Sequence, residues 1–352
     1  ALASASLALD ELNPAAWLAG APSARLRLRA TLTPQAKGVG GQFSVLNLQP
    51  GPLDQQRLPL ERLSSDFSWQ GEQARFNRIE ASLPGQGKLA GQAEWADQTL
   101  KLSLQASQLD AAQIVSQLRP TRLAGPLSAG LGAKRQSLQA QLADTRFQLQ
   151  LDASHADGRI ELDKLALSSG KARLLTSGKL ALSGSMDFAA EGELQHFDPS
   201  QFAQLPAAQI NAQFAADGRL APHTLINARF DLHDSQLAGQ LLSGNGRLSV
   251  DWPRIPRLDL QLAAGPNRLN ANGAFGRAGD SLAINLDAPK LDAYGLEGGL
   301  TGAFKLGGTS RQATLSAKLD SPKIGRRGLG KVHGLSLKAE LAGQADAALR
   351  LD

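Results

Sequence analysis

The residues that could carry chemistry in this sequence are few, and their spacing matches no familiar catalytic or metal site. Five histidines are scattered along the 352 residues without the spacing of a metal-ligand set: His155, His196, His223, His233 and His333. His223 and His233 flank one expected strand and could meet across a hairpin, although solvated positions are the simpler interpretation. The absence of cysteine excludes a disulfide framework, a Cys-ligated metal and a thiol nucleophile. We therefore expect neither a metal site nor a cofactor.

Glycines and serines that faintly resemble nucleotide or hydrolase motifs lack the surroundings that those motifs need. Gly85, Gly87 and Gly91 are spaced loosely like a phosphate-binding loop, but no Gly-Lys-Ser/Thr follows and no strand-to-helix transition is expected there. Ser183-Gly184-Ser185 lacks the strand–turn–helix context of a nucleophile elbow. Acidic residues are spread singly, which implies no pocket of paired carboxylates. These patterns predict a protein that is not an enzyme.

Positive charge is in mild excess and gathers near the end of the sequence. The net charge of +5 fits contact with an anionic surface, and it fits an ordinary solvated surface equally well. The basic cluster consists of Lys323, Arg326, Arg327, Lys331 and His333. It could contact lipid headgroups or an acidic partner, but a solvated glycine-rich loop is the favoured interpretation. No aromatic residues are interleaved with these cations, so we expect no nucleic-acid binding.

The dominant pattern is a strict alternation of apolar and polar residues, which predicts half-buried strands. Alternation places the apolar set on one face of an antiparallel sheet and the polar set on the other. Turn pairs such as Asp157-Gly158 and Asn245-Gly246 recur roughly every 8–14 residues, and this spacing predicts roughly thirty strands. The apolar positions that we expect to line the buried face are Leu26, Leu28, Leu102, Leu104, Phe147, Leu149, Leu151, Leu258, Leu260, Leu262, Leu282, Ile284, Leu286, Leu335 and Leu337.

Short helical segments interrupt the strands at regular distances. Asn13-Pro14, Asp110 and Asp198-Pro199 each predict a helix N-cap followed by a short helical turn, and a degenerate copy contains Asp292. These Asx residues lie 88 to 97 positions apart, which indicates a loose internal repeat. We therefore expect one continuous elongated β-repeat fragment over residues 1–352, with approximate units 1–95, 96–183, 184–277 and 278–352.

A sheet with one apolar face must bury that face, and the few expected helical turns cannot cover it. The sheet could pack on a second sheet, close into a barrel, or form a trough that something else fills. A membrane barrel would need aromatic girdles, whereas aromatic residues make up 5% of this chain. Sandwich cores hold interlocking aromatic and β-branched side chains, whereas this face offers mainly Leu and Ala. The composition favours a trough filled by a fluid ligand, with stacked sandwiches as the alternative.

Burial of a lipid acyl chain in such a trough would be energetically favourable. Burial contributes about 0.8 kcal/mol per methylene, so a chain of ~16 carbons gains on the order of 10 kcal/mol on leaving water. The sequence itself holds no apolar run close to the ~20 residues that a membrane helix needs. It begins at Ala1 without an initiator Met, and residues 348–352 still read as strand, so we expect a piece of a longer protein.

The sequence resembles the TamB-like proteins of Gram-negative envelopes, within the broader AsmA-like superfamily of bridge-like lipid transfer proteins. The resemblance covers nearly the whole chain and consists of a recurring pattern of Leu/Ala alternation, Gly-x-Leu turns and strands followed by helical caps. Two such units are Leu9-Asp10-Glu11-Leu12-Asn13-Pro14 and His196-Phe197-Asp198-Pro199. The stretch Leu-Glu-Gly-Gly-Leu-Thr-Gly-Ala-Phe-Lys-Leu-Gly-Gly at 296–308 is especially similar.

The resemblance implies an all-β fold, the elongated β-taco, in which mostly one long repeat-built sheet bends into a U around an apolar groove and carries a few short helical caps. It implies a periplasmic body of a protein anchored in the inner membrane by an N-terminal segment that this sequence does not contain. It also implies contact with an outer-membrane barrel of the TamA type, transport of phospholipids towards the outer membrane, and a role in outer-membrane protein assembly.

Three hypotheses remain open at this stage. The chain could be a lipid transfer module that shields phospholipid acyl chains in its groove. It could be a scaffold or chaperone for outer-membrane proteins that acts by β-strand addition at an open sheet edge. It could also be a structural spacer built of sandwiches.

Overall fold

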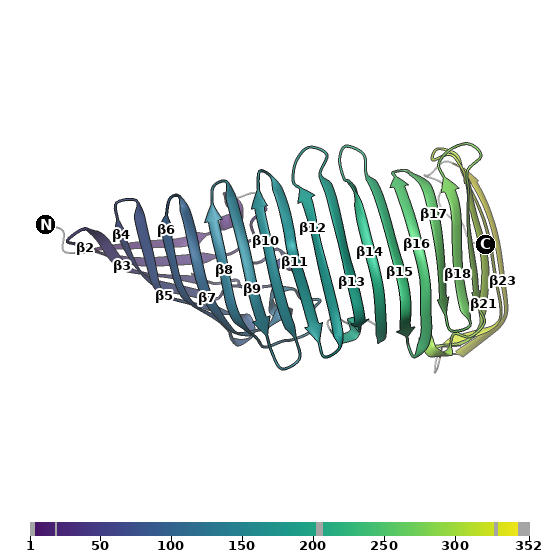
Figure 1. The fold of residues 1–352 in the computed structure, drawn as a ribbon, viewed down its shortest axis with the longest axis horizontal. Coiled ribbons are helices and arrows are strands. Elements are labelled where there is room, and N and C mark those ends of the chain that lie inside the picture. Colours follow the sequence, from purple (N-terminus) through teal and green to yellow (C-terminus); the bar gives the residue numbers. More distant parts are fainter. Residues whose placement is uncertain (1–3, 18–19, 202–206, 327–329, 344–352) are drawn as a thin grey trace. The chain divides into compact units, whose positions relative to one another are not determined.

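The fold is nearly all-β, with very little helix, as the alternation predicts. The computed structural model describes residues 4–17, 20–201, 207–326 and 330–343, and their 23 strands form one long, open antiparallel sheet. The predicted all-β fold with mostly one long sheet and a few short helical caps is confirmed (Figure 1). The strands are fewer than the roughly thirty expected, because several of them are 11 to 14 residues long.

The chain divides into two units, the first of which spans residues 1–170 and 201–205. Within this unit each strand pairs antiparallel with the next strand in sequence, from β1 to β11. Its strands are β1 (Ala5–Leu12), β2 (Leu26–Gln35), β3 (Gly38–Asn47), β4 (Arg62–Gln70), β5 (Gln73–Leu83), β6 (Gly87–Ala96), β7 (Thr99–Leu109), β8 (Leu123–Gly132), β9 (Arg135–Ala143), β10 (Gln148–Ala156) and β11 (Arg159–Ser169). Its helical segments are η1 (Pro14–Ala16), η2 (Leu53–Gln55), η3 (Pro84–Gln86) and α1 (Ala111–Ile114).

The second unit spans residues 171–200 and 206–352 and has the same architecture. Neighbours in sequence pair antiparallel here too, except that β19 pairs with β21 and the short β20 pairs with β22. Its strands are β12 (Ala172–Ala181), β13 (Asp187–Phe197), β14 (Ala208–Arg219), β15 (Leu225–Leu237), β16 (Gln240–Asp251), β17 (Arg254–Ala264), β18 (Asn267–Phe275), β19 (Ser281–Ala288), β20 (Leu296–Gly298), β21 (Leu300–Gly308), β22 (Ala313–Arg326) and β23 (Gly330–Gly343). The short turn η4 (Pro199–Gln201) follows β13, and η5 (Asp292–Tyr294) follows β19.

The strand register sorts side chains by polarity. On β7, Leu104 lies opposite Leu127 of β8, whereas its neighbour Ser103 lies opposite Ser128 on the other face. A slip of one residue would move every apolar side chain to the polar face, so the hydrophobic pattern fixes this register. Each hairpin repeats this separation of apolar and polar side chains.

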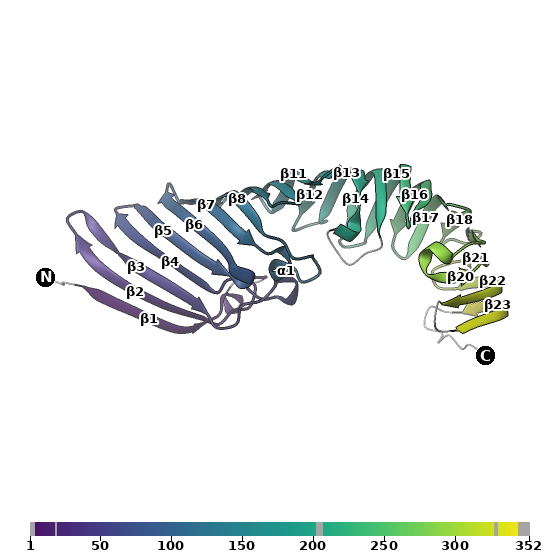
Figure 2. The same cartoon turned by 90° about the horizontal axis from the view of Figure 1, so that it is seen from below.

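The two ends of the strands in the first unit differ, and we name them the cap rim and the hairpin rim. The cap rim holds the connections β1–β2, β3–β4, β5–β6, β7–β8 and β9–β10, and it carries the helical segments η1, η2, η3 and α1 (Figure 2). The hairpin rim holds the remaining connections, which are tight turns. The turn at Asp157-Gly158 has φ angles of 50° and 68°, as a two-residue hairpin of the primed type requires.

The expected capping residues occupy the expected positions. Asp110 Oδ1 accepts hydrogen bonds from the backbone N–H of Ala112 at 3.0 Å and of Thr121 at 3.1 Å, so one carboxylate joins α1 to the segment that enters β8. Asn13 and Asp198 make the same two kinds of bond, to Ala15 and Ala24 and to Ser200 and Ala208 respectively. The fourth copy departs from this pattern, because η5 has Leu291 at its N-cap and no side-chain capping bond.

A β-bulge precedes each of these three caps. Two positions before each capping residue the backbone takes a positive φ, of 61° at Glu11, 53° at Gln108 and 45° at His196. The strand pairing shifts register at these places, as a bulge with one left-handed residue requires. This recurrence agrees with an internal repeat, while the boundaries of the four approximate units stay a prediction.

Replacing Asp110 with Ala removes the acceptor for both backbone N–H groups. We expect the free energy of unfolding to fall by about 1–2 kcal/mol, the usual effect of losing an N-cap acceptor. Asp110→Asn keeps an oxygen at the same position and should retain most of the stability. Chemical denaturation of the three proteins measures this, and an equal loss in both variants would show that the carboxylate acts in another way.

Asp144, in the connection between β9 and β10, should make stability depend on pH. Burial opposes ionisation, but the backbone N–H groups of Arg146, Phe147 and Arg122 donate to this carboxylate and hold its pKa below the usual value. A lowered pKa in the folded state means that the ionised form stabilises the fold above about pH 4, the unfolded value, and that this stabilisation is lost as the pH falls further. The stability difference between the native protein and Asp144→Asn should therefore shrink between pH 6 and pH 3, in denaturation experiments at each pH. A constant difference would contradict the assignment.

Candidate functional site

The candidate site in the first unit is an unbroken apolar face that crosses its strands. One cross-strand row runs from β7 to β11, with each residue paired to the next across the sheet. Its members are Leu104, Leu127, Ala140, Leu151 and Leu165. A neighbouring row closer to the hairpin rim consists of Ala93, Leu102, Ala129, Leu138, Ala153 and Leu162. The unit thus presents leucine and alanine side by side over many strands.

The second unit carries an apolar face of the same kind. A row from β15 to β18 pairs Ala228, Leu248, Leu258 and Gly273, and the next row pairs Phe230, Gly246, Leu260 and Ala271. The rows continue through β19 and β21, where Ile284 lies opposite Phe304 and Leu282 opposite Leu306. Leu319 of β22 then lies opposite Leu337 of β23.

All of the apolar positions singled out from the sequence lie on these two faces. Leu26, Leu28, Leu102, Leu104, Phe147, Leu149 and Leu151 belong to the first unit, and Leu258, Leu260, Leu262, Leu282, Ile284, Leu286, Leu335 and Leu337 belong to the second. Most are half-buried, but Phe147 and Leu282 are each only 4% exposed, so neighbouring side chains already enclose them. Their role in holding a ligand stays a prediction.

Little of the protein itself covers these faces. Each unit is a single layer of strands, with no second sheet stacked on it in the described part of the chain (Figure 2). Most buried apolar residues are alanines that taller neighbours shield, whereas Leu138 and Leu131 of the first unit remain 37% and 45% exposed. The accessible surface of 22014 Å² exceeds the about 16,000 Å² expected of two compact domains that share this mass. The apolar faces are therefore open.

Side chains of the first unit do close one part of its face. A core cluster at the cap rim consists of Ala106, Leu109, Leu123, Ala140, Leu142 and Phe147, each at most 8% exposed. Leu149 and Leu151 pack against this cluster and are only partly buried. The apolar face thus changes along the strand direction, from enclosed at the cap rim to open nearer the hairpin rim.

Sequence reasoning missed the aromatic part of the face, on β3 to β6. Phe43 lies 6.4 Å from Phe67 and 6.2 Å from Phe76 between ring centroids, and all three rings share the apolar face. Trp69 and Trp95 lie on the same face. An extra residue near Arg78 interrupts the period of two in β5 and obscures the pattern there, whereas β3 and β4 pair without a shift. The alternating triplets Phe67-Ser68-Trp69 and Ala93-Glu94-Trp95 were the signal that could have found it.

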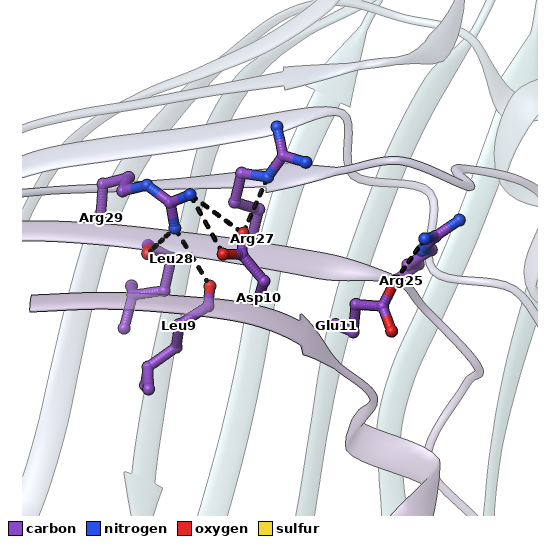
Figure 3. Close-up of polar contacts among 7 residues, drawn as sticks. All are labelled: Leu9, Asp10, Glu11, Arg25, Arg27, Leu28 and Arg29. Carbon is purple, nitrogen blue, oxygen red and sulfur yellow. Dashed lines mark hydrogen bonds and ion pairs between the residues drawn. The ribbon is translucent and has the colours of Figure 1, made fainter.

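The opposite face of the first unit is polar and charged. On β1 and β2, Asp10 accepts hydrogen bonds from Arg29 at 3.0 Å and from Arg27 at 2.9 Å, and Glu11 pairs with Arg25 (Figure 3). The Arg29 hydrogen bond is the main cause that holds the pKa of Asp10 below its usual value. Such exposed ion pairs add little stability. They mark this face as the one that water solvates.

Two hollows, of about 720 and 710 Å³, also open on this polar face. Their linings include Ser64 and Glu80 in one and Gln92 and Ser103 in the other. Such side chains offer hydrogen bonds. The hollows therefore differ in chemistry from the leucine rows on the opposite face.

The histidines and the basic cluster form no site in the described part of the chain. His223 precedes β15 and His233 lies ten residues further along that extended strand, so they are about 30 Å apart and do not meet across a hairpin. No group of three or more His, Asp or Glu side chains within the described ranges is placed to hold a metal. Of the basic cluster, Lys323 of β22 lies opposite His333 of β23, while Arg327 and the side chains of Arg326 and Lys331 lie outside the described residues.

The comparisons with known proteins give one match. A family model described as TamB, N-terminal domain, matches residues 136–352, which is more than half of the chain. No curated protein and no solved structure matches. Among the described residues, no helix has the length and apolarity that crossing a membrane requires.

Two leucines of β9 test whether the apolar face is open. Leu142 is 7% exposed and Leu138 is 37% exposed, on the same face of one strand. We expect Leu142→Ala to lower the free energy of unfolding by about 2–5 kcal/mol and Leu138→Ala by about 1 kcal/mol, because only the first leaves a cavity in a closed core. Denaturant titrations of both variants measure the difference. Equal, large losses would show that something covers Leu138.

Proposed function

Because this chain belongs to the TamB N-terminal domain family, we propose that it is a periplasmic bridge-like lipid transfer module. Its apolar faces would shield phospholipid acyl chains on the way between the inner and outer membranes. Members of the TamB family are transport and assembly proteins and are not enzymes. They are periplasmic, anchored in the inner membrane, and linked to TamA as a partner.

The observation that carries the proposal is that rows of leucine and alanine side chains cross the strands of each unit and are partly exposed to solvent. A row such as Leu102, Ala129, Leu138 and Ala153 presents hydrocarbon to solvent at a spacing of about 4.8 Å from strand to strand. Methylene groups laid on this surface leave water and contribute about 0.8 kcal/mol each. The rows place no fixed polar partner at their centre, which suits acyl chains shared by many phospholipids.

The remaining parts of the proposal follow from the family. The full-length protein would be anchored in the inner membrane of a Gram-negative bacterium, and an outer-membrane barrel of the TamA type would be its partner. We assign no residue of this chain to either contact. A strand-addition scaffold for outer-membrane proteins is the second candidate, and the observation that favours it is that the sheet is open, since its described strands do not close on themselves.

Charges placed on the two faces of β7 test the lipid proposal. The double variant Leu102→Arg/Leu104→Arg puts two guanidinium groups on the open apolar face, where each costs about 2.5–3.5 kcal/mol in contact with hydrocarbon. We expect phospholipid transfer between vesicles by the full-length protein to fall at least about tenfold, with the fold retained. Ser103→Arg/Gln105→Arg adds the same charge to the exposed polar face of the same strand and should leave transfer unchanged.

The result that would contradict lipid passage is unchanged transfer in the Leu102/Leu104 variant when circular dichroism shows it folded. A photoreactive residue at Leu104 separates the two candidates further. It should capture phospholipid under the lipid proposal, and capture of polypeptide alone would favour the scaffold.

A further inference from the structure

The apolar face of the first unit ends at the hairpin rim in a row of amphipathic side chains. This row runs across β4 to β11, with each member paired to the next: Trp69, Ala74, Trp95, Leu100, Leu131, Gln136, His155 and Ile160. Trp69 is 49% exposed, and its indole N–H donates to the carbonyl oxygen of Gly71 at 2.7 Å, which holds the ring at the rim. His155 and Gln136 are half-buried and hydrogen-bonded to each other. Indole, amide and imidazole groups combine an apolar body with a polar edge, as side chains at a membrane–water boundary do.

The row therefore differs from the rows behind it. One step deeper, the positions are Phe76, Ala93, Leu102, Ala129, Leu138 and Ala153, which carry no polar side-chain atom. Deeper still, at the cap rim, the core cluster closes the face with Leu109, Leu123, Leu142 and Phe147. A ligand on this face meets polar groups at one end of the strands and an enclosed hydrocarbon wall at the other.

Cations lie beside the amphipathic row. Lys134 occupies the β8–β9 turn and Arg135 begins β9, where it alternates with Gln136 and so lies on the polar face; both are exposed. No carboxylate is joined to either of them in the part of the chain that the structure describes. Lys37 occupies the β2–β3 turn of the same rim, whereas Glu72, Asp97 and Asp157 occupy the other three turns. Lys134 is thus the turn cation that lies beside the row, and phosphate is the anionic group that it complements at the end of an apolar surface.

The length of the open apolar face along the strands matches the thickness of one leaflet of a membrane. The hydrocarbon core of a bilayer is about 30 Å thick, so one leaflet of acyl chains needs about 15 Å. From Leu100 in the amphipathic row to Leu104 is four residues of strand, or about 13 Å. An acyl chain that starts at the row would end near Leu104, Leu127 and Ala140, where the core cluster begins.

Resting on the proposed lipid function, we propose that the first unit binds phospholipid in one fixed orientation across its strands. The ester and phosphate groups lie at the hairpin rim, against Trp69, Trp95, Gln136 and Lys134. The acyl chains point towards the cap rim. Lipid headgroups thus pass along one rim of this unit and not along both.

Fluorescence quenching by brominated phospholipids tests this orientation in the full chain. Trp17→Phe/Trp252→Phe removes the two other tryptophans, which are 72% and 67% exposed and lie off the amphipathic row, and leaves Trp69 and Trp95 as the reporters. We expect bromines close to the ester to quench this variant at least about twofold more than bromines close to the chain end. The matched control further replaces Trp69 and Trp95 with Phe and carries Leu104→Trp, and there the order of quenching should reverse.

The outcomes separate the orientation from the function. Bound lipid is measured independently, as organic phosphate extracted with the protein. The same order of quenching in both variants, or stronger quenching of Trp69 and Trp95 by the chain-end bromines, would overturn the orientation while lipid binding stands. Absence of bound lipid phosphate from the Trp17→Phe/Trp252→Phe variant and from the native chain would overturn the proposed function, and the orientation with it.

Discussion

The structure depends on the burial of an apolar sheet face for which the described residues supply almost no second layer. Each unit aligns leucine and alanine across successive strands, and the register that does so also places serine, glutamine and charged residues on the opposite face. Burial of apolar surface is the dominant favourable term in folding, so an open face of this size forgoes much of it. The unit retains its fold through continuous backbone pairing between neighbouring strands and through the small closed cluster around Leu142 and Phe147. On the proposed function, the open remainder of the face is where a hydrocarbon ligand would lie.

The cap rim shows how the chain limits this opening to one side. Asn13 and Asp110 in the first unit each use one side-chain oxygen to hold a helical turn and the entry to the next strand together. Asp54 of η2 accepts two hydrogen bonds from Ser116, 62 residues further along the chain, so the connections at this rim also support one another. The core cluster lies under these connections. The hairpin rim of this unit has only short turns, and under the proposed orientation this difference between the two rims would give a bound amphiphile its direction.

Much of the fold and of the apolar face could be predicted from the sequence, because the alternation and the capping residues are local signals. Alternation around Leu102, Leu149 and Leu260 identified the apolar face, and Asp110 followed by alanines identified the cap. The number of strands was overestimated, because the pair Asn245-Gly246, expected as a turn, lies inside the long strand β16. The aromatic region near Phe43 and Trp95 was missed, since the bulge at Arg78 shifts the side-chain period of β5 by one residue. The amphipathic row was beyond local patterns altogether, because Trp69, Gln136 and His155 become neighbours in one row only through the register of eight strands.

Membership of the TamB family and an open apolar face in each unit lead to the same central claim, that hydrocarbon from outside the chain covers what the chain leaves exposed. Native mass spectrometry of the detergent-free protein, with lipid extraction in parallel, tests it most directly. The account predicts phospholipid adducts that survive gel filtration and are displaced by added phospholipid. A protein that is folded, monodisperse and free of any lipid adduct, with Leu138 and Leu131 nonetheless protected from solvent, would contradict it.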